Sequence, residues 1–313
     1  MTPRVLVSIG EAMAEMSPLD EGTYRLGYAG DCLNLLWYAQ AVSDAGFQGR
    51  FVTAVGEDAI SSGLTQMVRA QGIETEHMMR RPRETLGLYM ITLAEGERSF
   101  SYWRGQSAAK HLASDQPRLR AALAGADVVF FSGVTLAILP PEDRKSFWAE
   151  IDFARRNGAL VAFDSNIRPQ LWSSAEEMRR ACEAAYRRCD LALATLEDER
   201  LLFGAGAAED AVARLQGFGV LECVIKQGDA PCLVASEGQM TYVAAEKVAH
   251  LVDTTGAGDS FNGGYLAARM AGQDPVSSAQ FAHRIAAQVV QTKGALMATS
   301  DCASLPKVAD LSA

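Results

Sequence analysis

Short runs of β-branched and aromatic residues alternate with longer segments of helical period along most of this chain, and this alternation constrains its fold most. Such alternation is typical of βα units arranged around a mostly parallel sheet. Buried strands are predicted at Val5–Ile9, Phe51–Val55, Val128–Phe131, Leu160–Phe163, Leu191–Ala194 and Glu222–Lys226. Helices are predicted at Cys32–Ala45, Ile60–Gln71, Pro141–Asn157, Ala175–Cys189, Gly258–Met270 and Val276–Thr292. The sequence therefore predicts a doubly wound α/β fold, with residues 1–313 in a single domain.

One region departs from this alternation. Two strands are predicted at Leu86–Leu93 and Arg98–Trp103, joined by a tight turn at Glu95–Gly96. The segment Glu15–Tyr28 is also extended and lacks helical period. These segments predict a small β-sheet, built from about residues 12–29 and 86–107, that is inserted in the domain as a lid. A hairpin on the edge of the main sheet is an equally good interpretation.

The composition is that of a globular protein, with 49% hydrophobic and 21% charged residues. A formal charge of −9 disfavours binding to nucleic acid or to a membrane surface, because both are anionic. The six cysteines form no C-x-x-C pair and have no histidine at metal-ligand spacing, so we expect reduced thiols and no metal bound by them. The apolar run within Met1–Gly10 is too short for a signal peptide, and we expect a cytoplasmic protein.

The strongest local signal is the run Asp-Thr-Thr-Gly-Ala-Gly-Asp at residues 253–259, which leads directly into a predicted helix. Gly256 and Gly258 permit a tight turn, and a helix N-terminus directs N–H groups and a positive dipole end toward an anion. The run therefore predicts an anion cradle. Asp259 is placed to accept a proton from a hydroxyl that attacks a bound phosphoryl group. Alternatively, Asp253 or Asp259 only caps the helix.

Three separated motifs, in the same order, resemble those of the ribokinase-like (PfkB) carbohydrate kinases. The run at residues 253–261 is similar to the C-terminal signature of that family. Gly30-Asp31-Cys32-Leu33-Asn34 resembles its sugar-binding Gly-Asp-x-x-Asn element, and Asp164-Ser165-Asn166-Ile167-Arg168 resembles its D-x-N-x-R segment. The resemblance covers nearly the whole chain and implies a ribokinase-like fold with a small β-sheet lid.

Within that family, further segments resemble the 2-keto-3-deoxygluconate kinases. They are Gly87-Leu88-Tyr89, Gly96–Phe100, Tyr102-Trp103-Arg104, Ser132–Leu139 and Arg168–Trp172. A keto-deoxy sugar acid carries a carboxylate, which a planar guanidinium binds with paired hydrogen bonds. Arg104 and Arg168 are the candidates, with Tyr89 and Tyr102 as neutral donors and walls. The alternative is ordinary strand alternation, with Trp103 in the core and Arg104 in solvent.

The resemblance implies transfer of the γ-phosphoryl group of ATP, with Mg²⁺, to the terminal hydroxyl of the sugar acid. By this analogy the substrate lies under the lid, where its hydroxyls are held by Gly30, Asp31 and Asn34. Asp259 removes the proton of the attacking hydroxyl. The N–H groups of the cradle that stabilise the phosphoryl oxygens are those of Gly256, Ala257 and Gly258.

On the nucleotide side, residues 226–231 resemble the strand-to-loop element of the family near ATP. Gly228 permits a sharp turn there. Lys226 is a candidate for the phosphates, although a lysine at a strand end is as often a surface charge. Asn166 and Arg168 are further candidates for the nucleotide. No G-x-x-x-x-G-K-[ST] run occurs, so a P-loop is not expected.

The sequence departs from the family pattern at two places. Many relatives have Asn-x-x-Glu where this chain has Thr195 followed by the acidic residues Glu197, Asp198 and Glu199. These carboxylates either organise water around Mg²⁺ or simply favour a helix start. Ala29 stands where relatives often have a second glycine, and we expect little effect from it.

Two other functions stay open at the level of sequence. One is another sugar kinase of the same family, acting on fructose, ribose or a nucleoside. The other is a sugar-acid-binding sensor without catalysis, although the cradle at residues 256–259 is intact. The sequence fits either the gluconate or the galactonate epimer. A homo-oligomer is plausible because exposed lid strands would otherwise be a liability.

Overall fold

Eight strands form the central sheet of the computed structural model, which describes residues 3–20, 22–94 and 97–312. Their order is β14-β13-β12-β11-β10-β9-β1-β4, and the six strands from β12 to β4 pair in parallel. These six are β1 (Arg4–Ile9), β4 (Phe47–Val52), β9 (Val128–Ser132), β10 (Leu160–Asp164), β11 (Leu191–Thr195) and β12 (Glu222–Gln227). The predicted α/β fold with a large, mostly parallel sheet is confirmed.

Two antiparallel strands that the alternation pattern does not reveal complete one edge of this sheet. They are β13 (Ala230–Ser236) and β14 (Gln239–Val243). The two-residue turn between them consists of Glu237 and Gly238, with φ angles of 51° and 76°. Positive φ at both central residues is the geometry that suits the right-handed twist of a hairpin. The Glu-Gly pair between two apolar runs was therefore a signal for this hairpin.

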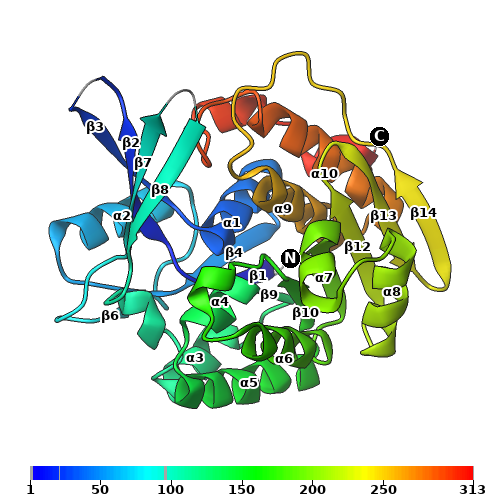
Figure 1. The fold of residues 1–313 in the computed structure, drawn as a ribbon, viewed down its shortest axis with the longest axis horizontal. Helices are drawn as coiled ribbons and strands as arrows, with labels where there is room; N and C mark the ends of the chain where they lie inside the picture. Colours follow the sequence, from blue (N-terminus) through cyan, green and yellow to red (C-terminus); the bar gives the residue numbers. More distant parts are fainter. Residues whose placement is uncertain (1–2, 21, 95–96, 313) are drawn as a thin grey trace.

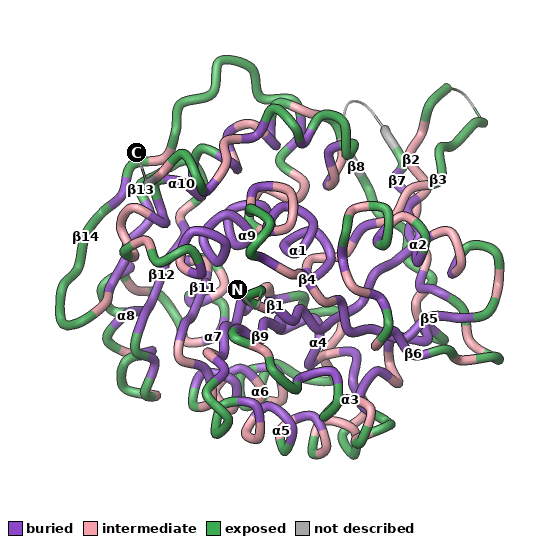
Figure 2. The backbone as a smooth tube through the Cα atoms, turned by 180° about the vertical axis from the view of Figure 1, so that it is seen from behind, coloured by how far each residue is buried: buried purple, intermediate pink, exposed green. Residues whose placement is uncertain are grey.

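Helices cover both faces of the central sheet (Figure 1). One apolar core lies between the sheet and α3 (Gln116–Leu123), α5 (Pro141–Arg156), α6 (Ala175–Tyr186) and α8 (Ala208–Gly217). The other lies between the sheet and α1 (Asp31–Val42), α2 (Ala59–Ala70), α9 (Ala257–Met270) and α10 (Pro275–Val289). Because both faces are covered, the six parallel strands are buried along most of their length, whereas the edge strand β14 is mostly exposed (Figure 2). This burial explains why they are continuous apolar runs.

The predicted helices agree with the observed ones except at their ends. The largest differences, of three residues each, are at the C-terminal ends of α1, α6 and α10. In α1 the helix ends at Val42 and not at Ala45, because Ser43 leaves the helix in an extended conformation (φ −84°, ψ 165°). Four helices were not predicted: α3, α8, the short α4 (Gly133–Ile138) and α7 (Leu196–Phe203). Each is short, so its apolar positions give little periodic signal.

The lid segments form a separate four-stranded sheet with the order β3-β2-β7-β8. Its strands are β2 (Met13–Pro18), β3 (Tyr24–Ala29), β7 (Leu88–Ala94) and β8 (Glu97–Trp103). This sheet projects from one side of the molecule (Figure 1), so the alternative of an edge hairpin on the main sheet is wrong. The predicted turn at Glu95–Gly96 lies outside the described residues. Two further strands, β5 (Ala54–Val55) and β6 (Met79–Arg80), pair in parallel as a separate two-stranded sheet.

The cysteines agree with the expectation of reduced thiols. All six are free and buried, as the sequence pattern predicts. Burial raises the pKa of the Cys32 and Cys189 thiols well above the usual value, so both stay protonated. Within the described ranges, no helix has the length and apolar character needed to cross a bilayer.

Candidate active site

A cavity of about 730 Å³ lies between the small sheet and the carboxyl ends of β10, β11 and β12. Ligands of open α/β sheets bind at this edge. Of the predicted site residues, the cavity is lined by Gly30, Asp31, Asn34, Tyr89, Tyr102, Arg104, Asn166, Arg168, Lys226, Gly256, Ala257, Gly258 and Asp259. Gly228 is not among the lining residues. The fold thus brings together motifs that are far apart in the sequence.

The turn that carries the predicted anion cradle ends at Gly256, the residue before α9. Gly256 has a φ of 79°, and a Cβ atom there would lie 2.7 Å from the carbonyl oxygen of Ala295. Only glycine satisfies both conditions. The N–H of Ala257 donates to the carbonyl of Thr254 at 3.1 Å, which closes the turn. The first turn of α9 leaves backbone N–H groups without an intrahelical acceptor at this edge of the cavity.

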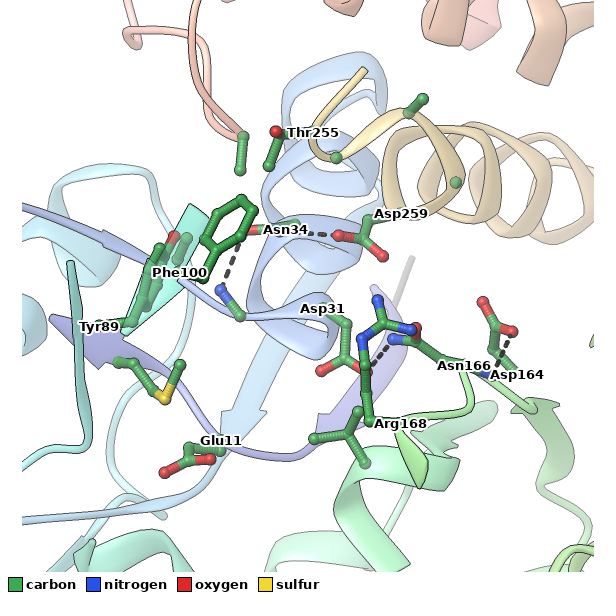
Figure 3. A pocket seen from close by; sticks show the side chains of 18 of the residues that line it. Glu11, Asp31, Asn34, Tyr89, Phe100, Asp164, Asn166, Arg168, Thr255 and Asp259 are labelled. Atoms are coloured by element: carbon green, nitrogen blue, oxygen red, sulfur yellow. Dashed lines mark hydrogen bonds between the residues drawn. The ribbon is translucent and has the colours of Figure 1, made fainter. Parts of the chain in front are cut away.

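Asp259 lies in this first turn of α9, half-buried, with its carboxylate in the cavity (Figure 3). Its Oδ2 atom accepts a 2.7 Å hydrogen bond from Nδ2 of Asn34. Burial raises the pKa of Asp259 to about 7, and the negative charge of Asp31 acts in the same direction. A carboxyl group with a pKa near neutrality is suited to take and return a proton.

The Gly-Asp-x-x-Asn element forms the start of α1 directly opposite Asp259. Gly30 is required by close approach, because a Cβ atom there would lie 2.1 Å from the carbonyl oxygen of Glu11. Asp31 accepts a 2.6 Å hydrogen bond from Nδ2 of Asn166 (Figure 3). This bond joins the Gly-Asp-x-x-Asn element to the D-x-N-x-R segment. Asn166 adopts a positive φ of 32°, a conformation that asparagine tolerates better than most residues.

Lys226 is buried at the wall of the cavity. Its Nζ donates to Oδ2 of Asp164 and to Oδ1 of Asn262, each at 2.9 Å. Nδ2 of Asn262 also donates to Asp164, at 2.6 Å. The alternative of a surface charge at a strand end is therefore wrong. Lys226 neutralises the carboxylate of Asp164, which also lines the cavity, and its positive charge lowers the pKa of Asp259.

The small sheet contributes an aromatic wall and one cation. The rings of Tyr89 and Tyr102 pack 5.9 Å apart. The hydroxyl of Tyr89 donates to Glu15, so this hydroxyl is already committed within the small sheet. Arg104 forms an ion pair with Glu11, whereas Trp103 is 56% exposed. The alternative with Trp103 in the core and Arg104 in solvent is wrong, because the strand register places these side chains the opposite way.

Arg168 is a further cation that lines the cavity. It is exposed, and the one hydrogen bond of its guanidinium within the part of the chain that the structure describes goes to the carbonyl of Ile167 at 2.8 Å. Figure 3 shows it above Asp31 and Asn166, directed into the same space. Its remaining donors are therefore accessible to an anion.

The acidic cluster at the start of α7 is divided between two environments. Glu197 and Asp198 line the cavity. Asp198 accepts hydrogen bonds from Ser165 and from the N–H of Ile167, and burial raises its pKa. Glu199 is turned away into the core, where Tyr186 donates to it at 2.6 Å. In the described portion of the molecule no group of three or more His, Cys, Asp or Glu side chains is arranged to hold a metal ion.

Comparison with known proteins agrees with this geometry. The signature of the pfkB family carbohydrate kinases matches residues 4–301. The chain belongs to the PfkB family.

Among relatives of this PfkB protein, the 2-dehydro-3-deoxygluconokinase of Dickeya dadantii is 37% identical over 304 residues, which are 95% of this chain and 98% of the relative. The 2-dehydro-3-deoxygluconokinase of Escherichia coli K12 is 38% identical with the same coverage. A fructokinase of Klebsiella pneumoniae is 28% identical over 97% of this chain and 96% of the relative.

Solved structures share the fold. The 2-dehydro-3-deoxygluconokinase of Thermotoga maritima superposes with a TM-score of 0.85 at 21% identity, over 99% of this chain and 98% of that one. The fructokinase of Xylella fastidiosa with bound ATP superposes with a TM-score of 0.84 at 21% identity, over 98% and 96%.

Three residues of this PfkB site were not singled out from the sequence. Glu11 and Asp164 line the cavity, and Asn262 bonds to Lys226 behind it. Asp164 opens the D-x-N-x-R segment, so its position at a strand end was a signal for the site. Glu11 lies in no recognisable motif, and Asn262 lies in a predicted apolar helix where the sequence gives no sign of a function. Only the tertiary structure brings these two to the site.

Proposed function

We propose that this PfkB protein transfers the γ-phosphoryl group of ATP to the terminal hydroxyl of 2-keto-3-deoxygluconate, giving 2-keto-3-deoxy-6-phosphogluconate and ADP. One observation carries the proposal: Asp259, with a pKa raised to about 7, shares one cavity with two arginine side chains. A base beside an anion cradle suits phosphoryl transfer, and the arginines suit the carboxylate that neutral sugars lack. The names of the relatives at 37% and 38% identity support the same substrate.

In this mechanism Asp259 accepts the proton of the terminal hydroxyl as that oxygen attacks the phosphorus. Asn34 orients the carboxylate through its 2.7 Å hydrogen bond. A positioned base contributes about 10²–10⁴-fold to such a reaction. The N–H groups of Gly256, Ala257 and Gly258 stabilise negative charge on the phosphoryl oxygens, and the loss of one such donor costs about 3–4 kcal/mol.

Sugar binding falls to the opposite walls of the cavity. The sugar hydroxyls exchange hydrogen bonds with Gly30, Asp31 and Asn34. Arg104 and Arg168 bind the carboxylate in paired, charge-assisted hydrogen bonds. Tyr89 and Tyr102 pack against the carbon skeleton, with the hydroxyl of Tyr102 as a neutral donor.

The nucleotide occupies the side of the cavity nearest the cradle. Bound ATP supplies the transferring phosphoryl group, and Mg²⁺ neutralises charge on the phosphates. Magnesium with nucleotides commonly needs only one or two carboxylates, the rest of its shell being water and phosphate. Glu197 and Asp198 meet that requirement, and Asn166 and Arg168 adjoin the same space. Gly228 adopts a φ of 66° in the turn after β12, which we assign to the outer part of the nucleotide site.

The small sheet acts as a lid over the sugar, and we propose that its outer face pairs two copies of the chain. Leu26 and Trp103 are 44% and 56% exposed on that face, and β3 and β8 are its edge strands. Light scattering should give twice the chain mass, and Trp103→Asp should give a monomer. A monomeric parent protein contradicts the pairing.

With six free cysteines and a formal charge of −9, we place the enzyme in the cytoplasm, without nucleic-acid or membrane partners.

ADP release by the purified protein tests the proposed function. The acceptors are 2-keto-3-deoxygluconate, 2-keto-3-deoxygalactonate, gluconate, fructose and ribose, each with Mg-ATP. We expect the highest kcat/KM for a keto-deoxy sugar acid. A higher kcat/KM for fructose or ribose would identify a different sugar kinase, and absence of ADP release with every acceptor would favour a binding protein.

A further inference from the structure

Glu11 and Arg104 meet where the chain enters and leaves the small sheet. Glu11 lies between β1 and β2, and Arg104 directly follows β8. Nη2 of Arg104 donates to Oε2 of Glu11. The Glu11 side chain is 2% exposed and that of Arg104 is 16% exposed. This buried ion pair therefore joins two of the chain segments that connect the small sheet to the rest of the molecule.

The pair is incomplete on both sides. Oε1 of Glu11 and Nε of Arg104 are buried, and neither has a hydrogen-bond partner among the residues that the structure describes. Buried polar atoms without partners are unfavourable, so a fold that keeps two of them at one cavity calls for an explanation. Both residues line the cavity assigned to the sugar acid. The Arg104 side chain keeps 16% exposure at this cavity, where an incoming carboxylate is a suitable partner for its guanidinium.

The backbone around Glu11 restricts where its carboxylate can go. A Cβ atom at Gly87 would lie 2.7 Å from Oε1 of Glu11. A Cβ atom at Gly30 would lie 2.1 Å from the carbonyl oxygen of Glu11. Gly30 and Gly87 lie in the two other connections between the small sheet and the core. Residues of the three other connections thus lie against Glu11: Arg104 and Gly87 beside its carboxylate, and Gly30 beside its backbone carbonyl.

We propose that Glu11 is the positioning residue for Arg104: it fixes the guanidinium in the cavity before substrate arrives, so that the carboxylate of the sugar acid meets an arginine already in place. This inference rests on the proposed function. An arginine that is ordered in advance loses less conformational entropy on binding. Glu11 touches neither the attacking hydroxyl nor the cradle in this arrangement, so its removal weakens substrate binding more than turnover.

Steady-state kinetics of Glu11→Gln with 2-keto-3-deoxygluconate tests the proposal. The amide keeps the shape of the side chain and removes its charge. We expect KM for the sugar acid to rise at least about tenfold while kcat changes less than about threefold. Glu11→Asp keeps the charge but moves the carboxylate away from Arg104, so KM should rise less than in Glu11→Gln. If Glu11→Gln does not fold, Glu11→Asp is measured in its place. An unchanged KM in a folded variant overturns the proposal.

Glu150→Gln is the matched control, because Glu150 is also fully buried and pairs with Arg120 between α3 and α5. It should lower Tm and leave KM for the sugar acid unchanged. If Glu150→Gln raises KM as much as Glu11→Gln does, the effect is general destabilisation and the proposal fails.

A double-mutant cycle separates positioning from a merely structural role. Arg104→Ala alone leaves Glu11 as a buried, uncompensated charge, so adding Glu11→Gln should raise its Tm. In that background Glu11→Gln should change KM less than about twofold, because the residue to be positioned is gone. Equal effects on KM in both backgrounds overturn the proposal. If the parent enzyme does not phosphorylate the sugar acid, the proposed function fails first, which distinguishes the two failures.

Discussion

Asn34 donates its side-chain amide to Oδ2 of Asp259 at 2.7 Å, and this hydrogen bond joins the start of α1 to the first turn of α9. The other end of the same amide, Oδ1, accepts the N–H of Gly30 at 3.2 Å. The two contacts fix the orientation of the Asn34 amide, so that a donor and not an acceptor faces the carboxylate. The hydrogen bond holds the pKa of Asp259 lower than burial alone would allow.

This relationship predicts the pH dependence of turnover. Asp259 acts as a base only when ionised, and its pKa is raised to about 7, so kcat should fall as the pH drops below that value. Asn34→Leu removes a hydrogen bond to the ionised form and should move this acidic limb to higher pH. Profiles of kcat between pH 5 and about 9 measure both effects. An acidic limb at the same pH in the variant would contradict the assignment of Asp259 as the base.

Replacement of the base itself should abolish most of the activity. Asp259→Asn keeps the size of the side chain but cannot take a proton, so we expect kcat to fall at least about 10²-fold while the fold persists. Circular dichroism and Tm check the fold. Asp274→Asn is the control, since Asp274 caps α10 and does not line the cavity. Near-parental kcat in Asp259→Asn would reject the assignment.

The same substitution should stabilise the protein in a pH-dependent way. Folding raises the pKa of Asp259, so between pH about 4 and 7 the folded chain binds a proton that the unfolded chain has lost. The free energy of unfolding contributed by this group therefore decreases as the pH rises through that window. The Asp259→Asn variant has no carboxylate at this position, so it does not lose stability in this way as the pH rises. Its Tm should exceed the parental Tm by at least about 2 °C at pH 8, and the difference should shrink toward pH 4. A constant difference would contradict this reasoning.

Arg104 should determine the preference for an acid over a neutral sugar. We expect Arg104→Ala to raise KM for 2-keto-3-deoxygluconate at least about tenfold, because a charge-assisted contact with the carboxylate is lost. Arg179 is exposed on α6, and Arg179→Ala should leave KM unchanged. If the true substrate is a neutral sugar, its KM will hardly respond to Arg104→Ala.

The conformation of Gly256 should be required for catalysis as well as for folding. Alanine at a positive φ costs about 1–2 kcal/mol, and a Cβ atom would also lie 2.7 Å from the carbonyl of Ala295. Gly272 has a φ of 92°, and a Cβ atom there would have no neighbouring atom within 4 Å, so Gly272→Ala isolates the effect of φ alone. Both variants should lower Tm, but only Gly256→Ala should also lower kcat. Equal kcat values would mean that the turn tolerates a shift.

The parts of the site that form within one short segment could be predicted from the sequence. Gly256 and Asp259 fall at a helix start that is visible as a glycine-rich run before apolar periodicity, and the structure has α9 begin there. The orientation of Lys226 was not predictable, because its two partners, Asp164 and Asn262, come from other elements. Asn34, whose partner Asp259 is 225 residues away, was found only because its motif resembles that of the family.

The small sheet shows the same division. Its strands were visible in the sequence as extended segments. Whether the Arg104 side chain faces the cavity, however, depends on the pairing of β8 with β7. A shift of one residue in that pairing would have exchanged Trp103 and Arg104. The strand pattern therefore predicted the sheet but left both orientations open, and only the family resemblance favoured Arg104 at the site.

The packing of α1 against α9 has a consequence for synthesis of the chain. Asn34 and Asp259 are 225 residues apart, and Tyr38 on α1 packs in the same apolar core as Tyr265 on α9. During synthesis of the chain, the surface of α1 that packs against α9 stays uncovered until residues 257–270 have been translated. We therefore expect this apolar surface of α1 to be open to chaperones during synthesis, and the contact between Asn34 and Asp259 to form only after α9 has emerged.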